Sequence, residues 1–184
     1  MDMRWKRVAM AAATALAACL STAAAQEVEL GTFDGWRLFE IPGDACVMVT
    51  PANHETAQSR VYLRFEPGRT TELVAGTILP MEVPDPDAVD WGRLTPAEAV
   101  YAFGTGAESG TVPGSQAEVH VGYEYLDPHR VRLDLYFDAD EAMLDALARS
   151  QVFAVSIDGD NVFFGVAHAG RALAEARRCS ARQD

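Results

Sequence analysis

Residues 117–137, AEVHVGYEYLDPHRVRLDLYF, carry the strongest structural signal in the chain. Apolar and polar side chains alternate along 119–125 and again along 131–137, which is typical of strands that bury one face. The two segments follow each other closely, so this stretch predicts an antiparallel hairpin with one polar face.

The apolar sets of the two strands share a face only if the numbers of paired residues sum to an even value, as they do for 125 with 131. A slip of one residue would turn one set to solvent. We therefore expect an odd-length loop, with Glu124 opposite Arg132 and His120 opposite Tyr136 on the polar face.

Working outward from this hairpin, the sequence predicts an α+β fold, mainly an antiparallel β-sheet or sandwich. Alternating patterns and turn formers predict further strands at 36–40, 45–50, 60–65, 71–78, 152–157 and 162–167, with residue 155 paired to 162 or 164. Capping and amphipathic patterns predict helices at 95–103, near 139–149 (beginning at Asp138) and near 171–181, the last placing Cys179 on its buried side.

The 184 residues, of which 49% are apolar, suit one globular domain, which we place at 26–184. No repeat or linker divides it. Two stretches read as irregular: 80–90, with three prolines and four acids, and the glycine-rich segment 104–115, which we expect to be a mobile loop.

The N-terminus has the pattern of an export signal. Residues 1–7 are basic, 8–20 are apolar, and the segment ends in small residues, with Ala23 and Ala25 suitable for signal-peptidase cleavage. Residues 1–25 are therefore expected to be a signal peptide, and the protein to be exported to the periplasm.

A second interpretation is a lipoprotein. Residues 16–19, Leu-Ala-Ala-Cys, resemble a lipobox, which would make 1–18 the signal and Cys19 the lipidated residue. The protein would then be anchored to the envelope by lipid, and this is the only route by which we expect it to contact a membrane.

The formal net charge of −12 becomes more negative once residues 1–25 are removed, because 12 arginines, no lysine and 26 acidic residues remain. Such a surface is repelled by phosphate backbones and by anionic lipid headgroups. We therefore expect no nucleic-acid partner, whereas a basic partner or divalent cations stay open. We also expect no transmembrane span in the mature chain, because no apolar run after the N-terminus reaches the ~18 residues needed to cross a bilayer.

Two cysteines remain after processing, Cys46 and Cys179. In an oxidising compartment the simplest expectation is one disulfide between them, and the alternative is two separate buried thiols.

The chain offers few candidates for catalysis. Its histidines lack the spacing of a metal site, and we find no nucleophile elbow, phosphate-binding loop or dinucleotide fingerprint. His120 and Glu118 share the polar face of one strand with Tyr136 nearby, so they form a possible acid/base group, although an ordinary solvated histidine is the competing interpretation. We expect no cofactor.

The acidic loop offers a second candidate. Asp85, Asp87 and Asp90 gather carboxylates of the kind that hard cations prefer, but the spacing does not match an EF-hand, so a solvated loop competes with a cation site and no metal is expected. Trp91 follows directly and, if exposed, would anchor a protein partner.

The order of features resembles the invasion-associated locus B family of exported Gram-negative envelope proteins. The resemblance comprises a signal peptide, Asp34-Gly35-Trp36, Cys46-Val47-Met48 and a C-terminal hairpin leading into Gly170-Arg171-Ala172-Leu173 and Cys179. It implies a small exported β-rich domain without an established enzymatic site.

Together these features lead us to expect a non-catalytic exported envelope protein that binds a macromolecular partner, a protein or another envelope component. The alternative is a small hydrolase, or a divalent-cation-dependent binding protein. It would use His120 and Glu118, or the loop from Asp85 to Asp90.

Mass spectrometry of the exported protein tests the processing and the cross-link. We expect an N-terminus at Gln26 and no free thiol before reduction, because Ala23 and Ala25 suit the peptidase and the compartment oxidises thiols. A diacylated Cys19 would instead identify a lipoprotein, and thiols that can be alkylated in the native protein would contradict the disulfide.

Overall fold

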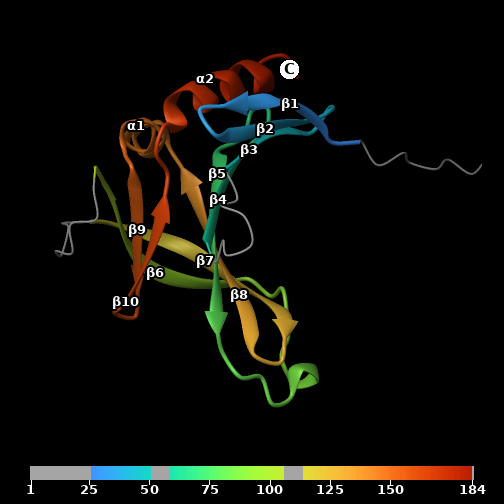
Figure 1. Ribbon diagram of the computed structural model, residues 1–184, viewed down its shortest axis with the longest axis vertical. Helices are drawn as coiled ribbons and strands as arrows, with labels where there is room; N and C mark the ends of the chain where they lie inside the picture. The colour runs from blue at the N-terminus through green and yellow to red at the C-terminus, as the bar shows by residue number, and fades with distance from the viewer. Residues whose placement is uncertain (1–25, 51–58, 106–113, 184) are drawn as a thin grey trace, which may run out of the picture.

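A computed structural model describes residues 26–50, 59–105 and 114–183. The expected signal peptide with Cys19, and most of the loop expected to be mobile at 104–115, lie outside these residues. The fold is α+β and mainly antiparallel, as expected (Figure 1). Its elements are β1 (Val28–Phe33), β2 (Trp36–Ile41), β3 (Ala45–Val49), β4 (Ser59–Phe65), β5 (Thr71–Pro80), the 3₁₀ turn η1 (Pro86–Ala88), β6 (Thr95–Gly104), β7 (Ser115–Asp127), β8 (Arg130–Ala139), α1 (Glu141–Arg149), β9 (Val152–Ile157), β10 (Asp160–Gly165) and α2 (Ala169–Ser180).

The ten strands of the described chain form a single sheet in the order β1-β2-β3-β4-β5-β8-β7-β6-β9-β10, with every pairing antiparallel. The sheet curls until β10 contacts β4, so that its inner face encloses one hydrophobic core. Phe153 lies in the middle of an aromatic group there, 4.8 Å from Phe103 and 5.5 Å from Phe137 between ring centroids.

Helix α2 lies over β1, β2 and β3 at one end of the molecule (Figure 1). As predicted, Leu173 and Cys179 are on its buried side, together with Ala172 and Ala176. Cys179 is disulfide-bonded to Cys46 of β3, with 6.1 Å between their Cα atoms. The bond therefore joins the C-terminal helix to the N-terminal part of the sheet.

Helix α1 begins two residues later than predicted. Its N-cap is Asp140, whose carboxylate accepts a hydrogen bond from the Met143 amide at 2.8 Å, whereas Asp138 is still part of β8. The predicted apolar stripe of Met143, Leu144 and Leu147 is buried. The error arose because both aspartates precede acceptable first-turn residues, and only the strand pairing of β8 separates them.

The register of the β7–β8 hairpin is as predicted. Tyr125 pairs with Val131, His120 lies opposite Tyr136, and Glu124 lies opposite Arg132 and forms an ion pair with it. Five residues, 126–130, separate Tyr125 from Val131, an odd number as predicted. The strands continue to a two-residue turn, and a bulge between Tyr125 and Asp127 absorbs the extra residue.

The prediction of a helix at 95–103 was also wrong, because this segment is strand β6. It pairs with β7 on one side and with β9 on the other, and it points Ala99 and Tyr101 toward the core. The capping pattern at the start of this segment is short, and it is outweighed by the alternation of apolar residues and by pairing with two neighbouring strands. Pro96 is tolerated because it lies where β6 pairs with β7 alone.

The other predicted strands are present, and the sequence reading missed β1. Val155 pairs with Val162, one of the two predicted registers, although β10 ends earlier than expected, at Gly165. Trp36 is fully buried and its indole nitrogen donates to the carbonyl of Ala167 at 2.9 Å. No helix within the described residues is long and apolar enough to cross a membrane.

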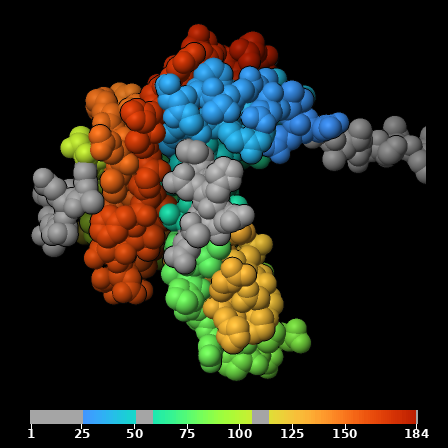
Figure 2. Space-filling view, viewed as in Figure 1, coloured from blue at the N-terminus to red at the C-terminus, as the bar shows by residue number. Residues whose placement is uncertain are grey.

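One part of the molecule extends away from the core, and we call it the arm. It consists of the end of β5, the tip of the β7–β8 hairpin and the connecting segment 81–94, which contains η1 (Figure 1). Figure 2 shows the arm as a separate lobe below the main body. The segment is held there by backbone bonds, including Met81 N–H to the His129 carbonyl at 3.1 Å.

Gly76 provides a test of the β5–β8 pairing on the outer face. It lies directly opposite Asp134, and a Cβ atom at Gly76 would be 2.2 Å from an oxygen of that carboxylate. We expect Gly76→Ala to lower the free energy of unfolding by about 1–3 kcal/mol through overpacking.

Gly165→Ala is the matched control, because a Cβ there has no neighbour within 4 Å. Urea unfolding measures both variants. Equal stability of the two would contradict the close approach of Asp134 to β5.

Candidate functional site

The residues of the acidic loop lie on the arm. Asp85, Asp87 and Asp90 are exposed around η1, while Trp91 is half-buried. The Trp91 indole donates to the Pro86 carbonyl at 2.7 Å, and its ring packs 5.5 Å from that of Tyr125. Trp91 thus attaches the loop to the hairpin, which leaves less of its ring available to a partner than the sequence suggested.

Metal binding was the other possibility for this loop. Within the described residues, no three or more His, Cys, Asp or Glu side chains gather in a way that could hold a metal ion.

The polar face of the hairpin brings together the other predicted group. His120 and Glu118 of β7 and Tyr136 of β8 line a depression of about 290 Å³ on the outer face of the sheet. Two carboxylates that sequence reasoning did not assign to this group, Glu72 of β5 and Asp138 of β8, line it as well.

This depression adjoins two others. Glu72 and Asp138 also line a depression of about 480 Å³ toward the β4–β5 turn, and Glu118 also lines one of about 640 Å³ that reaches Asp158 in the β9–β10 turn. Because they share lining residues, the three depressions adjoin one another in a row across β5, β8, β7 and β6. We call this row of depressions the acidic groove.

Carboxylates follow the acidic groove in the register of the sheet. Glu72 lies directly opposite Asp138, and Glu98 of β6 lies directly opposite Glu118 of β7. Like charges at directly opposite positions destabilise a sheet. The groove therefore carries a local cost to folding, which a positively charged occupant would relieve.

Apolar and aromatic side chains accompany these carboxylates. Leu94 and Tyr136 line the central depression, and Pro96 and Val100 line the largest one. Leu94 and Val100 are among the exposed large hydrophobic residues of the molecule. The groove therefore offers apolar contact as well as negative charge.

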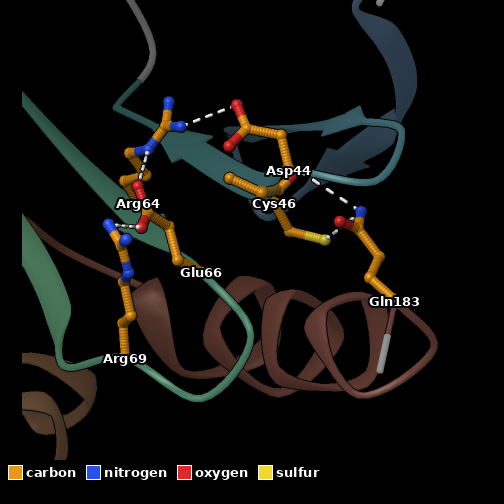
Figure 3. Close-up of polar contacts among 7 residues, drawn as sticks. Asp44, Cys46, Arg64, Glu66, Arg69 and Gln183 are labelled. Atoms are coloured by element: carbon orange, nitrogen blue, oxygen red, sulfur yellow. Dashed lines mark hydrogen bonds and ion pairs between the residues drawn. The ribbon is translucent and has the colours of Figure 1, made fainter.

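Arginines occupy the end of the groove near the β4–β5 turn. Arg64 pairs with Asp44 and with Glu66, each at 2.7 Å, and Arg69 pairs with Glu66 at 2.8 Å (Figure 3). The hydrogen bond from Arg64 lowers the pKa of Glu66. Arg64 lies opposite Glu72 in the sheet, but its guanidinium is held by these other carboxylates.

Glu72 is left in a different environment from Glu66. Burial raises the pKa of Glu72 above its ordinary 4.5; Arg64 opposes this effect, and the nearby charges of Glu66 and Asp138 add to it. Burial also raises the pKa of Tyr136. Like other tyrosines it keeps its phenol proton at neutral pH, so it can donate a hydrogen bond.

Asp134 lies beside the groove, on the same outer face. It is 8% exposed, with one carboxylate oxygen 3.5 Å from Arg60 and the other buried without a hydrogen-bond partner in the described structure. Burial raises its pKa. Gly76 faces it from β5, so Asp134 fills space that this glycine leaves open.

Sequence reasoning missed Glu72 and Asp138 for a structural reason. Asp138 was assigned to the start of a helix, and nothing local indicated that β5 pairs with β8. The signal that could have found Asp138 is the alternation of polar residues along 132–138, whereas 72–76 (ELVAG) has no such alternation, so no local pattern could place Glu72.

Comparisons with known protein families, with curated proteins and with solved structures found no match to this chain.

The raised pKa of Glu72 predicts how stability depends on pH. As pH rises above the ordinary value of 4.5, the unfolded chain loses this proton first, so the folded protein binds more protons and its stability falls until Glu72 ionises in the fold. Glu72→Gln should remove that fall, because glutamine stays neutral.

Urea unfolding of both proteins from about pH 4 to about pH 7 measures the effect. The gain in stability from Glu72→Gln should grow with pH. It should largely persist in high salt, since burial is the main cause. A constant difference between the two proteins across this range would contradict the assignment.

Proposed function

We propose that this chain is a non-catalytic exported envelope protein that binds a macromolecular partner, and that the partner is a protein which lays a positively charged, extended segment in the acidic groove. The observation that carries the proposal is that the depressions of the groove adjoin one another. Three depressions share carboxylate lining residues across four neighbouring strands.

Charge complementarity supports a basic segment. Glu98, Glu118 and Asp138 are exposed in the groove, and the chain as a whole has a formal charge of −12. Lysine and arginine side chains can pack their aliphatic stems against Leu94 and Tyr136 while their charged ends reach the carboxylates. Complementary charge also speeds association with such a partner.

Several features support export to the envelope. The N-terminal pattern is that of a signal peptide, and a disulfide between Cys46 and Cys179 suits an oxidising compartment. The resemblance to the invasion-associated locus B family points the same way. Lipid anchoring through Cys19 is compatible with the proposal, because binding would take place on the folded domain.

Two variants of matched charge test the proposal. One neutralises the groove (Glu98→Gln, Glu118→Gln and Asp158→Asn), and the other neutralises the arm (Asp85→Asn, Asp87→Asn and Asp90→Asn). With a fluorescent peptide of alternating lysine and alanine as probe, we expect the groove variant to bind about tenfold more weakly, while the arm variant changes affinity by less than about twofold.

Equal losses of affinity in both variants would show that the peptide binds through net charge alone. A loss of affinity confined to the arm variant would show that the peptide binds at the acidic loop. Either result overturns the groove as the binding site. A pull-down from envelope extract with the same two variants then identifies the natural partner.

A hydrolase is the second candidate, and one observation favours it. His120 lines the same depression as Glu72, Glu118 and Asp138, so a base and several carboxylates are close together. Turnover of an ester, peptide or glycan panel that disappears in His120→Ala would replace the binding proposal.

A further inference from the structure

The disulfide lies at the end of α2, beneath the last residues of the chain. Cys46 and Cys179 are both 0% exposed. The chain continues past α2 in a turn, where the amide of Arg182 donates to the Cys179 carbonyl and that of Gln183 to the Ser180 carbonyl, each at 3.0 Å. This turn, residues 181–183, directs the chain back toward β3.

The side chain of Gln183 lies against Sγ of Cys46, the β3 half of the disulfide (Figure 3). Its amide nitrogen lies 3.4 Å from Sγ of Cys46, 3.4 Å from the Ala45 carbonyl and 3.4 Å from a carboxylate oxygen of Glu40. Glu40 lies directly opposite Cys46 in the β2–β3 pairing. The Gln183 amide thus contacts both the sulfur of Cys46 and the carboxylate of Glu40.

The Gln183 side chain is weakly held compared with the core around it. Its three polar contacts are at the long end of hydrogen-bond distances, and the Oε1 atom of Gln183 is buried without a partner in the described structure. A buried oxygen without a partner costs free energy, which favours release of the side chain. The residue also lies in a short turn outside the helix and the sheet, where local opening costs less than unfolding.

We propose that Gln183 and Glu40 form a gate over the disulfide, which opens by displacement of the C-terminal turn and admits neutral or cationic thiols in preference to anionic ones. Displacement of Gln183 uncovers Sγ of Cys46 while the rest of the fold stays in place. The carboxylate of Glu40 remains beside the sulfur and repels a reductant that carries further negative charge.

The reaction at the gate is thiol–disulfide exchange with a low-molecular-weight thiol. Its thiolate attacks Sγ of Cys46, the S–S bond breaks, and Cys179 leaves as a thiolate that takes up a proton. A second thiolate attacks the mixed disulfide and releases Cys46. Two thiols are thereby oxidised to one disulfide, and the protein disulfide gains two electrons.

The test measures the rate of reduction of the oxidised protein by cysteamine and by 2-mercaptoethanesulfonate, compared at equal thiolate concentration. Alkylation followed by mass spectrometry reports the reduced fraction. We expect Gln183→Ala to speed reduction by about tenfold, as the loss of weak hydrogen bonds implies. The control Arg182→Ala, at an exposed neighbouring position, should change the rate by less than about twofold.

The charge of the gate is tested with Glu40→Gln, which should bring the rates with the two thiols closer together. Urea unfolding of each variant separates the gate from general instability, because opening of the turn accelerates reduction more than it lowers the free energy of unfolding.

An unchanged rate in Gln183→Ala would overturn the gate, and so would an acceleration fully accounted for by lost global stability. A thiol preference that is unchanged in Glu40→Gln would overturn the role of the carboxylate.

Discussion

Strand β5 pairs with β8 along its whole length, from Thr71 opposite Ala139 to Pro80 opposite Arg130. This ladder joins the N-terminal strands, which follow one another in sequence order, to the C-terminal half of the sheet. Because side chains alternate across a strand, its inner face supplies Leu73 to the core, while its outer face sets Glu72 beside a carboxylate of β8. Without this pairing there is neither a closed core nor an acidic groove.

The outer face combines features that do not favour stability. Opposed carboxylates repel one another, and Asp134 has a buried oxygen without a partner in the described structure. The sheet tolerates them because its inner face is packed into one core and because Gly76 makes room for Asp134. Such local conflict on a well-packed scaffold is typical of surfaces that serve binding rather than folding.

The disulfide links the two ends of this arrangement. Cys46 and Cys179 are 133 positions apart, and the chain-entropy account gives about 5 kcal/mol for closing a loop of this length. It holds α2 against β3, while Trp36 binds the segment before α2 through the Ala167 carbonyl. Helix α2 is therefore held near both of its ends, by the Trp36 hydrogen bond before its first residue and by the disulfide at Cys179. The arm projects from another part of the sheet (Figure 1).

The sequence by itself determined the local features of this protein. Alternation fixed the register of His120 opposite Tyr136, the helical stripe pointed Cys179 inward, and two cysteines indicated one bond. Only the tertiary structure decided what depends on contacts between distant strands. Segment 95–104 is strand β6 because it pairs with β7 on one side and with β9 on the other. The pairing of β5 with β8 places Glu72 directly opposite Asp138. The periodicity of a sequence indicates which face of a helix or strand is buried, but not which other element packs or pairs with it. The groove depends on that pairing of distant strands.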